Sequence, residues 1–295
     1  MSFNRTRELT GMRASALTEE KIRELLEEDL GYGDITSDSL LGPAHRARAT
    51  VYLKEEGVAA GLAEIGALFR LLGCDVWLHG EDGARAEAGQ VLMEVQGEVR
   101  AILAGERTAL NILGRMSGIA TSVAEAVAAA GRVSPSVRVA ATRKTVPGLR
   151  ELDKRAVELG GGDTHRFRLD DCVLIKDNHL MFGFTISEAV ERARRRVSFT
   201  KKIEVEVRTL EEAREAARAG ADIVMFDNMS PDEISDCLRA LDGEGLSGSR
   251  LFEASGGITM ENIAEYAASG VDVVSMGSLT HSVRSLDVKL RVERA

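Results

Sequence analysis

The sequence has 295 residues, 44% hydrophobic and 29% charged, which is enough apolar material for a large core in one or two domains. Its formal net charge of -9 and the lack of any run of roughly 18 apolar residues argue against nucleic-acid partners, membrane spans and export signals. Cys74, Cys172 and Cys237 are widely spaced, which indicates neither a disulfide framework nor a thiolate zinc site and favours the cytoplasm.

The first part of the chain predicts a small α+β domain. Thr18 is a typical N-cap, followed by acidic residues and by leucines on one helical face up to Gly31. The segments ARATVYL and GQVLMEVQG are typical of strands, and GLAEIGALFRLL between them is typical of an apolar helix. We predict an N-terminal α+β open sandwich domain over residues 1–113, completed by residues 280–295, where LDVKLRVER alternates like a strand.

The second part predicts a parallel sheet covered by helices. An Ala-rich helical pattern from Ile102 to about Gly131 connects it to the first domain. Six apolar runs then alternate with amphipathic helical patterns, at residues 137–141, 172–175, 203–207, 223–226, 251–254 and 271–276. Because each strand is followed by a helix that would cover it, we expect residues 114–279 to form an incomplete, about six-stranded α/β barrel.

Polar residues follow each predicted strand, and the active sites of α/β barrels lie at that end of the strands. They are Thr142-Arg143-Lys144, Lys176 to His179, Glu206, Asp227-Asn228, Ser255-Gly256-Gly257 and Gly277-Ser278. The last two groups place small residues before predicted helices, where backbone N–H groups bind phosphate, although a glycine pair after a strand is also an ordinary turn. We therefore predict a site with a phosphate-binding half at one mouth of the barrel.

Two carboxylates end neighbouring predicted strands. Glu206 and Asp227 would lie together, and such a pair suits a divalent cation or two ribose hydroxyls. The alternative is an ion pair with Lys202 or a helix-capping role. Glu204 faces the same side of its strand as Glu206, so it either shares that role or pairs with a cation.

Cations gather in the same part of the sequence, where they suit a carboxylate together with a phosphate or pyrophosphate. Four of them are Arg143, Lys144, Arg166 and Lys176. For each one alone, the alternative is a surface ion pair. Three glycines before Asp163 predict a loop that brings His165 and Arg166 to a ligand. His165 is either protonated there or a structural hydrogen-bonding residue. His45, His79 and His281 show no metal-ligand spacing with each other or with acidic residues.

Motifs along nearly the whole chain resemble the quinolinate phosphoribosyltransferases, also called carboxylating nicotinate-nucleotide pyrophosphorylases. The motifs are EDLGYGDIT, ERTALNIL, RMSGIAT, TRKTVPGLR, GGGDTHR, VLIKDNH, IEVEV, IVMFDNMSP, EASGGIT and VSMGSLTHS. The resemblance implies transfer of a phosphoribosyl group from phosphoribosyl pyrophosphate to quinolinate with Mg²⁺. The products would be nicotinate mononucleotide, carbon dioxide and pyrophosphate, on the route to NAD.

The resemblance also implies residue roles. The pyridine dicarboxylate and the pyrophosphate would be held by Arg107, Arg143, Lys144, His165, Arg166 and Lys176. Arg107 would reach in from the neighbouring subunit of a homodimer or a dimer-based oligomer. Glu206 and Asp227 would meet the ribose hydroxyls and Mg²⁺, and would be catalytic together with Lys144 and Lys176. The 5′-phosphate would be bound by Ser255, Gly256, Gly257, Gly277 and Ser278.

Three positions depart from the family pattern. Ala141, Val146 and Thr164 stand where the family often has an acidic residue, a hydroxyl residue and Asn, respectively. A molybdenum-associated paralogue shares the fold but lacks the IKDNH run that is present here. The alternatives to quinolinate phosphoribosyl transfer are transfer to nicotinate or another monocarboxylate and a non-catalytic small-molecule sensor. A third alternative is a lipoyl or biotinyl carrier domain, which the segment GQVLMEVQG resembles. A carrier needs a lysine at the tip of its hairpin. The expected tip, residues 94–96, has the sequence Glu-Val-Gln and contains no lysine.

Overall fold

The computed structural model describes residues 15–294 in two compact units. Among these residues the first unit takes in the chain up to Ser122, residues 147–161 and the stretch from Val283; the second unit comprises residues 123–146 and 162–282. Residues 1–14, where the sequence predicts an untargeted leading segment, lie outside the described residues. Within residues 15–294, every helix is too short or too polar to cross a lipid bilayer.

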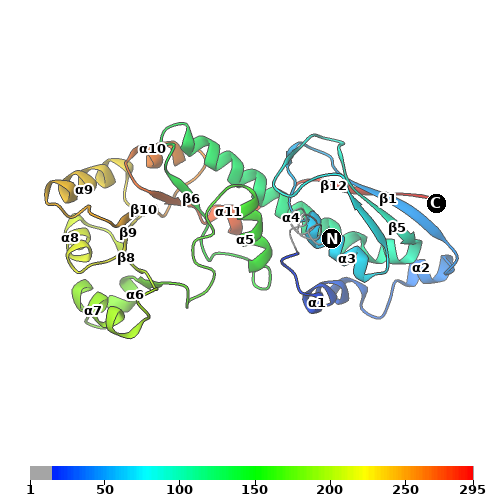
Figure 1. Ribbon diagram of the computed structural model, residues 1–295, viewed down its shortest axis with the longest axis horizontal. Helices are drawn as coiled ribbons and strands as arrows, with labels where there is room; N and C mark the ends of the chain where they lie inside the picture. Colours follow the sequence, from blue (N-terminus) through cyan, green and yellow to red (C-terminus); the bar gives the residue numbers. More distant parts are fainter. Residues whose placement is uncertain (1–14, 295) are drawn as a thin grey trace, which may run out of the picture. The chain divides into compact units, whose positions relative to one another are not determined.

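The first unit is built on an antiparallel sheet with the strand order β12-β1-β5-β3 (Figure 1). Its strands are β1 (Arg46–Leu53), β3 (Asp75–Leu78), β5 (Val91–Glu98) and β12 (Val288–Arg294). Pairing of Ala47 with Arg294 through Leu53 with Val288 confirms that the end of the chain returns to this sheet. A separate two-stranded ribbon is formed by β2 (Gly57–Val58) and β4 (Arg85–Ala86).

The predicted hairpin tip at residues 94–96 is wrong, because these residues lie inside β5. They pair with β1 on one side and β3 on the other, as Thr50 opposite Glu94 and Trp77 opposite Glu94 show. Alternation of buried and less buried residues continues through β5, so its sequence specifies a central strand. The carrier alternative therefore has no exposed tip at this place.

The first unit also contains helices, of which α3 contacts β3 and β5 of the sheet. They are α1 (Glu19–Leu30), α2 (Ile35–Leu40), α3 (Leu62–Leu71), α5 (Arg150–Leu159) and the first part of α4 (Val99–Gly131). The Thr18 hydroxyl accepts a hydrogen bond from the Lys21 N–H, which confirms the predicted N-cap. Residues 147–161, which the sequence analysis assigned to the barrel, group with the first unit. Arg115 of α4 makes two hydrogen bonds, of 2.8 and 2.9 Å, to the fully buried Asp153 of α5.

The second unit contains a six-stranded parallel sheet with the order β6-β11-β10-β9-β8-β7. The strands are β6 (Arg138–Ala140), β7 (Val173–Ile175), β8 (Ile203–Val207), β9 (Ile223–Asp227), β10 (Leu251–Ser255) and β11 (Val273–Ser275). All six predicted runs thus form strands. Its first strand, β6, pairs with its last, β11, and Ala140 also bridges to Asp163, so the sheet curls into the expected incomplete barrel.

Helices follow the strands of the second unit and lie outside them (Figure 1). They are α6 (Asp177–Leu180), α7 (Ile186–Arg196), α8 (Leu210–Arg218), α9 (Pro231–Gly243), α10 (Ile263–Ala268) and α11 (Ser278–His281). Thr185, Thr209 and Ser230 cap α7, α8 and α9 through side-chain oxygens that accept backbone N–H groups. These caps fix the starts of the three helices, and thereby the loops that connect them to the carboxyl ends of the preceding strands. The polar residues at those strand ends are held in place as a result.

Candidate active site

Three carboxylates and one arginine meet at the carboxyl ends of β7, β8 and β9. Arg208 Nη2 lies 3.0 Å from Asp227 Oδ2, 3.1 Å from Asp177 Oδ2 and 3.7 Å from Glu206 Oε1. The predicted proximity of Glu206 and Asp227 is therefore observed, and their partner is Arg208 rather than Lys202. We call Asp177, Glu206, Arg208 and Asp227 the rim cluster.

The rim cluster carries an excess of negative charge. Burial, and then the charges of Asp227 and Asp177, raise the pKa of the Glu206 carboxyl, while Lys176 and Arg208 act in the opposite direction. The side chains of Glu206 and Asp227 keep 16% and 14% exposure, whereas Arg208 keeps 53%. The guanidinium of Arg208 is thus much more exposed to solvent than the two carboxylates of Glu206 and Asp227 that it pairs with.

The loop after β10 is shaped by two glycines in the left-handed region, Gly256 at φ 93° and Gly257 at φ 66°. A Cβ on Gly256 would lie 2.4 Å from Asn228 Oδ1, so a side chain has no room there. The Ser255 carbonyl accepts a hydrogen bond of 2.9 Å from the Asn228 N–H. The loop runs on to α10, which begins at Ile263, so the predicted helix follows the glycines after an intervening stretch of loop.

Lys144 lies beside the loop after β11. Its carbonyl accepts a 2.9 Å hydrogen bond from the Thr280 hydroxyl, and a Cβ on Gly277 would lie 3.0 Å from its Cδ. Ser278 directly follows Gly277 and begins α11. The exposed Lys144 and the half-buried Arg143 thus share the carboxyl ends of β6 and β11 with the second predicted phosphate loop.

The two remaining predicted cations of this unit differ in their contacts. Lys176 is half-buried directly after β7, and its positive charge lowers the pKa of Glu206, which places it at the rim cluster. Its backbone N–H donates to His179 Nδ1 at 3.2 Å. Arg166 Nη1 donates to the Cys172 carbonyl at 3.4 Å, so the guanidinium lies along its own loop.

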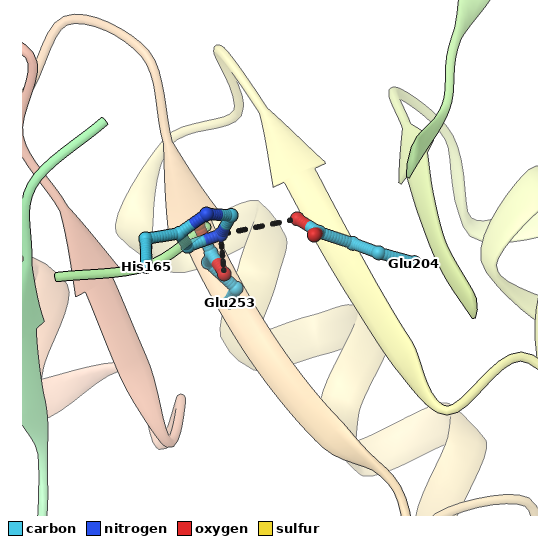
Figure 2. A group of neighbouring side chains, drawn as sticks. All are labelled: His165, Glu204 and Glu253. Atoms are coloured by element: carbon cyan, nitrogen blue, oxygen red, sulfur yellow. Dashed lines mark hydrogen bonds and ion pairs between the residues drawn. The ribbon is translucent and has the colours of Figure 1, made fainter. Parts of the chain in front are cut away.

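His165 turns toward the inside of the barrel (Figure 2). Its φ of 52° and a 2.8 Å hydrogen bond from its N–H to Asp163 Oδ1 reverse the chain at this residue. The imidazole Nε2 lies 3.2 Å from Glu253 Oε2 on β10 and 3.5 Å from Glu204 Oε1 on β8. We call His165, Glu204 and Glu253 the interior cluster, and Glu204 is thus found paired with a cation.

The interior cluster lies deeper than the rim cluster. The side chains of Glu204 and Glu253 are 0% and 2% exposed. Burial alone would lower the pKa of His165, but its hydrogen bonds and charge interactions with the two glutamates outweigh this and raise it to about 10. The raised pKa favours the imidazolium at neutral pH, and the same contacts make His165 a hydrogen-bonding partner of two buried glutamates, so both expectations for this residue stay open.

Cys172 lies against one of these carboxylates, that of Glu204. Its Sγ is 3.8 Å from Glu204 Oε2. Burial and the negative charge of Glu204 raise the pKa of the Cys172 thiol to about 11, so it stays protonated at neutral pH. All three cysteines are free thiols.

Arg107 belongs to the first unit, where it lies exposed on α4. It lines a cavity of about 510 Å³. Asn111, one helical turn further along α4, and Leu149 before α5 line the same cavity. The predicted role of Arg107 in a neighbouring subunit therefore concerns a residue whose side chain is accessible.

Comparison with known proteins covers both units. Residues 34–117 match the family described as quinolinate phosphoribosyl transferase, N-terminal domain, and residues 119–291 match its C-terminal domain. The chain belongs to the quinolinate phosphoribosyltransferase family. The family resemblance found in the sequence motifs is thus confirmed.

Named relatives and solved structures agree with this family. A probable carboxylating nicotinate-nucleotide pyrophosphorylase from Methanothermobacter thermautotrophicus is 45% identical, covering 92% of this chain and 97% of its own. The human carboxylating nicotinate-nucleotide pyrophosphorylase is 39% identical, with 86% and 85% coverage. The crystal structure of NadC from Streptococcus pyogenes superposes with a TM-score of 0.88 at 36% identity, covering 96% of this chain and 100% of that one. The predicted fold class is confirmed by this likeness.

Two residues of the rim and interior clusters were missed in the sequence. Arg208 directly follows β8, where a single exposed charge at a strand end gives no signal of its own. Glu253 lies within the EASGGIT motif, two residues before Ser255 and on the same side of the strand. A carboxylate in an otherwise apolar strand was the signal that could have identified it, as it did for Glu204.

Proposed function

We propose that this chain is a carboxylating nicotinate-nucleotide pyrophosphorylase. It transfers a phosphoribosyl group from phosphoribosyl pyrophosphate to the ring nitrogen of quinolinate and yields nicotinate mononucleotide, carbon dioxide and pyrophosphate in NAD biosynthesis. The observation that carries the proposal is the rim cluster with Lys176, on a chain of the quinolinate phosphoribosyltransferase family. It combines carboxylates for a ribose with cations for a leaving pyrophosphate in one place.

Orientation is the first contribution of the protein. Arg143, Lys144, Arg166 and His165 hold the dicarboxylate, and the loops Ser255 to Gly257 and Gly277-Ser278 hold the 5′-phosphate. The left-handed glycines at 256 and 257 favour this role, since they let backbone N–H groups approach an anion closely. Holding both reactants converts a two-body reaction into a step within one complex.

Charge stabilisation is the second contribution. As the ring nitrogen bonds to the ribose C1′, the bond from C1′ to the pyrophosphate oxygen breaks and its electrons leave with pyrophosphate. C1′ gains oxocarbenium character, which Glu206 and Asp227 stabilise next to the ribose hydroxyls. Lys176 and Lys144 stabilise the negative charge that builds on pyrophosphate.

Decarboxylation follows from the charge of the product ring. Once the nitrogen is quaternary, the pyridinium ring holds the electron pair left when the C2 carboxylate departs as carbon dioxide. A proton then adds at C2 to give nicotinate mononucleotide. No side-chain nucleophile is needed, which agrees with the protonated state of Cys172.

Magnesium fits the rim cluster. Asp177, Glu206 and Asp227 offer carboxylate oxygens, the ligands that Mg²⁺ prefers, and they already gather around the positive charge of Arg208. These residues would hold the ion directly or through water. When bound, Mg²⁺ would neutralise charge on the pyrophosphate leaving group.

Arg107 supports an assembly of at least two subunits. It is exposed and lies at the edge of a cavity in the first unit, so it is available to a site formed with another copy of the chain. We therefore propose a homodimer or a dimer-based oligomer. The free state of all three cysteines favours a reducing compartment, and we propose the cytoplasm.

Pyrophosphate release tests the function. Purified protein is incubated with phosphoribosyl pyrophosphate, quinolinate and Mg²⁺, and we expect equal amounts of pyrophosphate, carbon dioxide and nicotinate mononucleotide. Nicotinate replaces quinolinate in a parallel reaction, where little turnover is expected. Absence of turnover by correctly folded protein contradicts the proposal, and a higher kcat/KM for nicotinate moves the assignment to a monocarboxylate.

A further inference from the structure

The interior cluster uses only one nitrogen of His165. Both contacts to Glu204 and Glu253 involve Nε2, and Nδ1 takes part in neither (Figure 2). The ring keeps 15% of its surface exposed, although both glutamate side chains are almost fully buried. Two carboxylates therefore hold one edge of the ring, and the other edge stays available.

The protonation state of the ring decides what Nδ1 can bind. A neutral imidazole has one N–H, and if Nε2 donates it to Glu253, Nδ1 has a lone pair that repels a carboxylate. An imidazolium donates from both nitrogens at once. Only the charged form can therefore satisfy the glutamates at Nε2 and bind an anion at Nδ1.

His165 is the positive charge that both glutamates contact. Glu204 Oε1 lies 3.5 Å from Nε2, and Glu253 Oε1 is buried without a hydrogen-bond partner. Unpaired buried carboxylates are costly, and a nearby positive charge reduces that cost. Removal of the imidazolium proton would leave both carboxylates facing a neutral ring, so the cluster resists deprotonation.

We infer that Glu204 and Glu253 are positioning residues that keep His165 as an imidazolium, whose Nδ1–H binds one carboxylate of the pyridine dicarboxylate. The inference rests on the proposed function, because it assigns this ligand to His165. It predicts that quinolinate binding does not depend on the titration of His165 near neutral pH.

Other charged groups surround the cluster. A cavity of about 150 Å³ next to it is lined at the amino ends of the strands by Arg138, Ile223, Leu251 and Val273. The titratable or charged groups that face His165 or its partners from these elements are Glu204, Glu253, Asp163, Arg166, Arg138 and Cys172. Asp163 Oδ1 accepts a hydrogen bond from the backbone N–H of His165, and Asp163 Oδ2 lies 3.6 Å from Arg138 Nη1. The Asp163 carboxylate is therefore already paired with a cation.

Kinetics of Glu253→Gln against pH test the inference. We expect the KM for quinolinate of the unaltered enzyme to stay flat from pH 6 to 8.5. In the variant the imidazolium is less stabilised, and we expect this KM to rise about tenfold per pH unit above the lowered pKa. The KM for phosphoribosyl pyrophosphate should follow the unaltered enzyme. A pH-independent KM for quinolinate in a folded Glu253→Gln variant overturns the inference.

His165→Asn provides the matched control. Its KM for quinolinate should be raised and flat with pH, and adding Glu253→Gln to it should change this KM no further. Circular dichroism checks folding, and Glu204→Gln replaces Glu253→Gln if the latter does not fold. If Glu253→Gln raises the KM for quinolinate by the same factor in the His165→Asn background as in the unaltered enzyme, Glu253 acts independently of His165. That result contradicts the inference.

NMR of isotope-labelled histidine separates this inference from the proposed function. The His165 ring should remain an imidazolium above pH 8 in the unaltered protein and titrate at lower pH in Glu253→Gln, with no substrate present. If turnover of quinolinate is absent while the His165 ring titrates as expected, the proposed function is wrong, but the conclusion that Glu253 keeps His165 as an imidazolium is retained. A neutral ring at pH 7, or a stoichiometric metal ion that Glu253→Gln releases, overturns the inference.

Discussion

The rim cluster and the interior cluster share one strand but keep their charges in different ways. Glu206 belongs to the first and Glu204 to the second, two residues apart on the same side of β8. At the rim the partner is Arg208, which is 53% exposed; inside the barrel it is His165, which is 15% exposed. Two residues along the strand thus separate a carboxylate with an exposed cation from a carboxylate with a mostly buried one.

This difference matches what each position has to do. Under the proposed function the rim cluster has to take up a metal ion and a sugar, and an ion pair with an exposed guanidinium in water contributes little to holding its carboxylates. A group that recognises a planar dicarboxylate has to keep its orientation, which burial and two carboxylate partners provide. Depth in the barrel therefore separates exchange from recognition, and the following variants test that separation.

The largest effect on activity is expected at the rim, from Lys176→Ala. Removing this charge deprives the departing pyrophosphate of stabilisation, and loss of one such group typically costs about 10²–10³ in kcat. Steady-state kinetics with quinolinate and phosphoribosyl pyrophosphate measure the loss. The matched control is Lys202→Ala, an exposed lysine just before β8, which should keep kcat near the original value. Near-normal kcat in Lys176→Ala contradicts the assigned role.

The largest effect on stability is expected inside the barrel, from His165→Ala. It leaves two buried carboxylates without their cation, and breaking a buried pair in this way typically costs about 3–5 kcal/mol. Urea unfolding measures the change in the free energy of unfolding. Arg208→Ala at the rim removes a half-exposed cation and should leave the Tm almost unchanged. Equal losses in the two variants would show that depth does not distinguish the clusters.

A smaller effect is expected in the loop after β10. Gly256→Ala forces a methyl group to within 2.4 Å of Asn228 Oδ1 at a φ of 93°, and such overpacking typically costs about 1–3 kcal/mol. We expect lower stability together with a raised KM for phosphoribosyl pyrophosphate. Gly257→Ala is the matched control, because it also has a positive φ but open space around its Cβ. Similar losses in both variants would indicate backbone strain alone.

Much of the fold follows from local sequence patterns. Each strand of the barrel is a short apolar run, such as IEVEV at β8, and β8 and β9 are each followed directly by a capped amphipathic helix. The membership of α5 does not follow from such patterns, since chain order places it between barrel strands. It is determined by the buried contact of Asp153 with Arg115, which only the folded chain brings together.

The site was predictable where polar residues end strands, as Glu206 and Asp227 do. Two features of the site could not be predicted from the sequence. The inward turn of His165 depends on a positive φ that non-glycine residues seldom adopt, and sequence gives no sign of it. The engagement of Arg208 depends on three carboxylates from separate strand ends, and nothing distinguishes this arginine from other surface arginines in a local window.

The dependence of stability on pH gives the finest test of the two clusters. The pKa of His165 is about 10 in the folded chain against an ordinary value of 6.5, so folding favours the protonated ring. The stabilisation it provides is complete below pH 6.5 and is lost as the pH rises toward 10. Burial also raises the pKa of Glu253, and this shift has the same sign, because a raised pKa always favours the folded state at lower pH.

We therefore expect the free energy of unfolding to fall steadily between pH 6.5 and pH 10 in the unaltered protein. His165→Asn lacks the titrating ring and should show a weaker decline over this range, although it is less stable throughout. Arg208→Ala keeps the interior cluster and should follow the slope of the unaltered protein. Urea unfolding at intervals of one pH unit measures all three slopes. If His165→Asn retains the full slope, other groups determine the pH dependence, and the imidazolium is not the fixed charge that distinguishes the interior cluster from the rim.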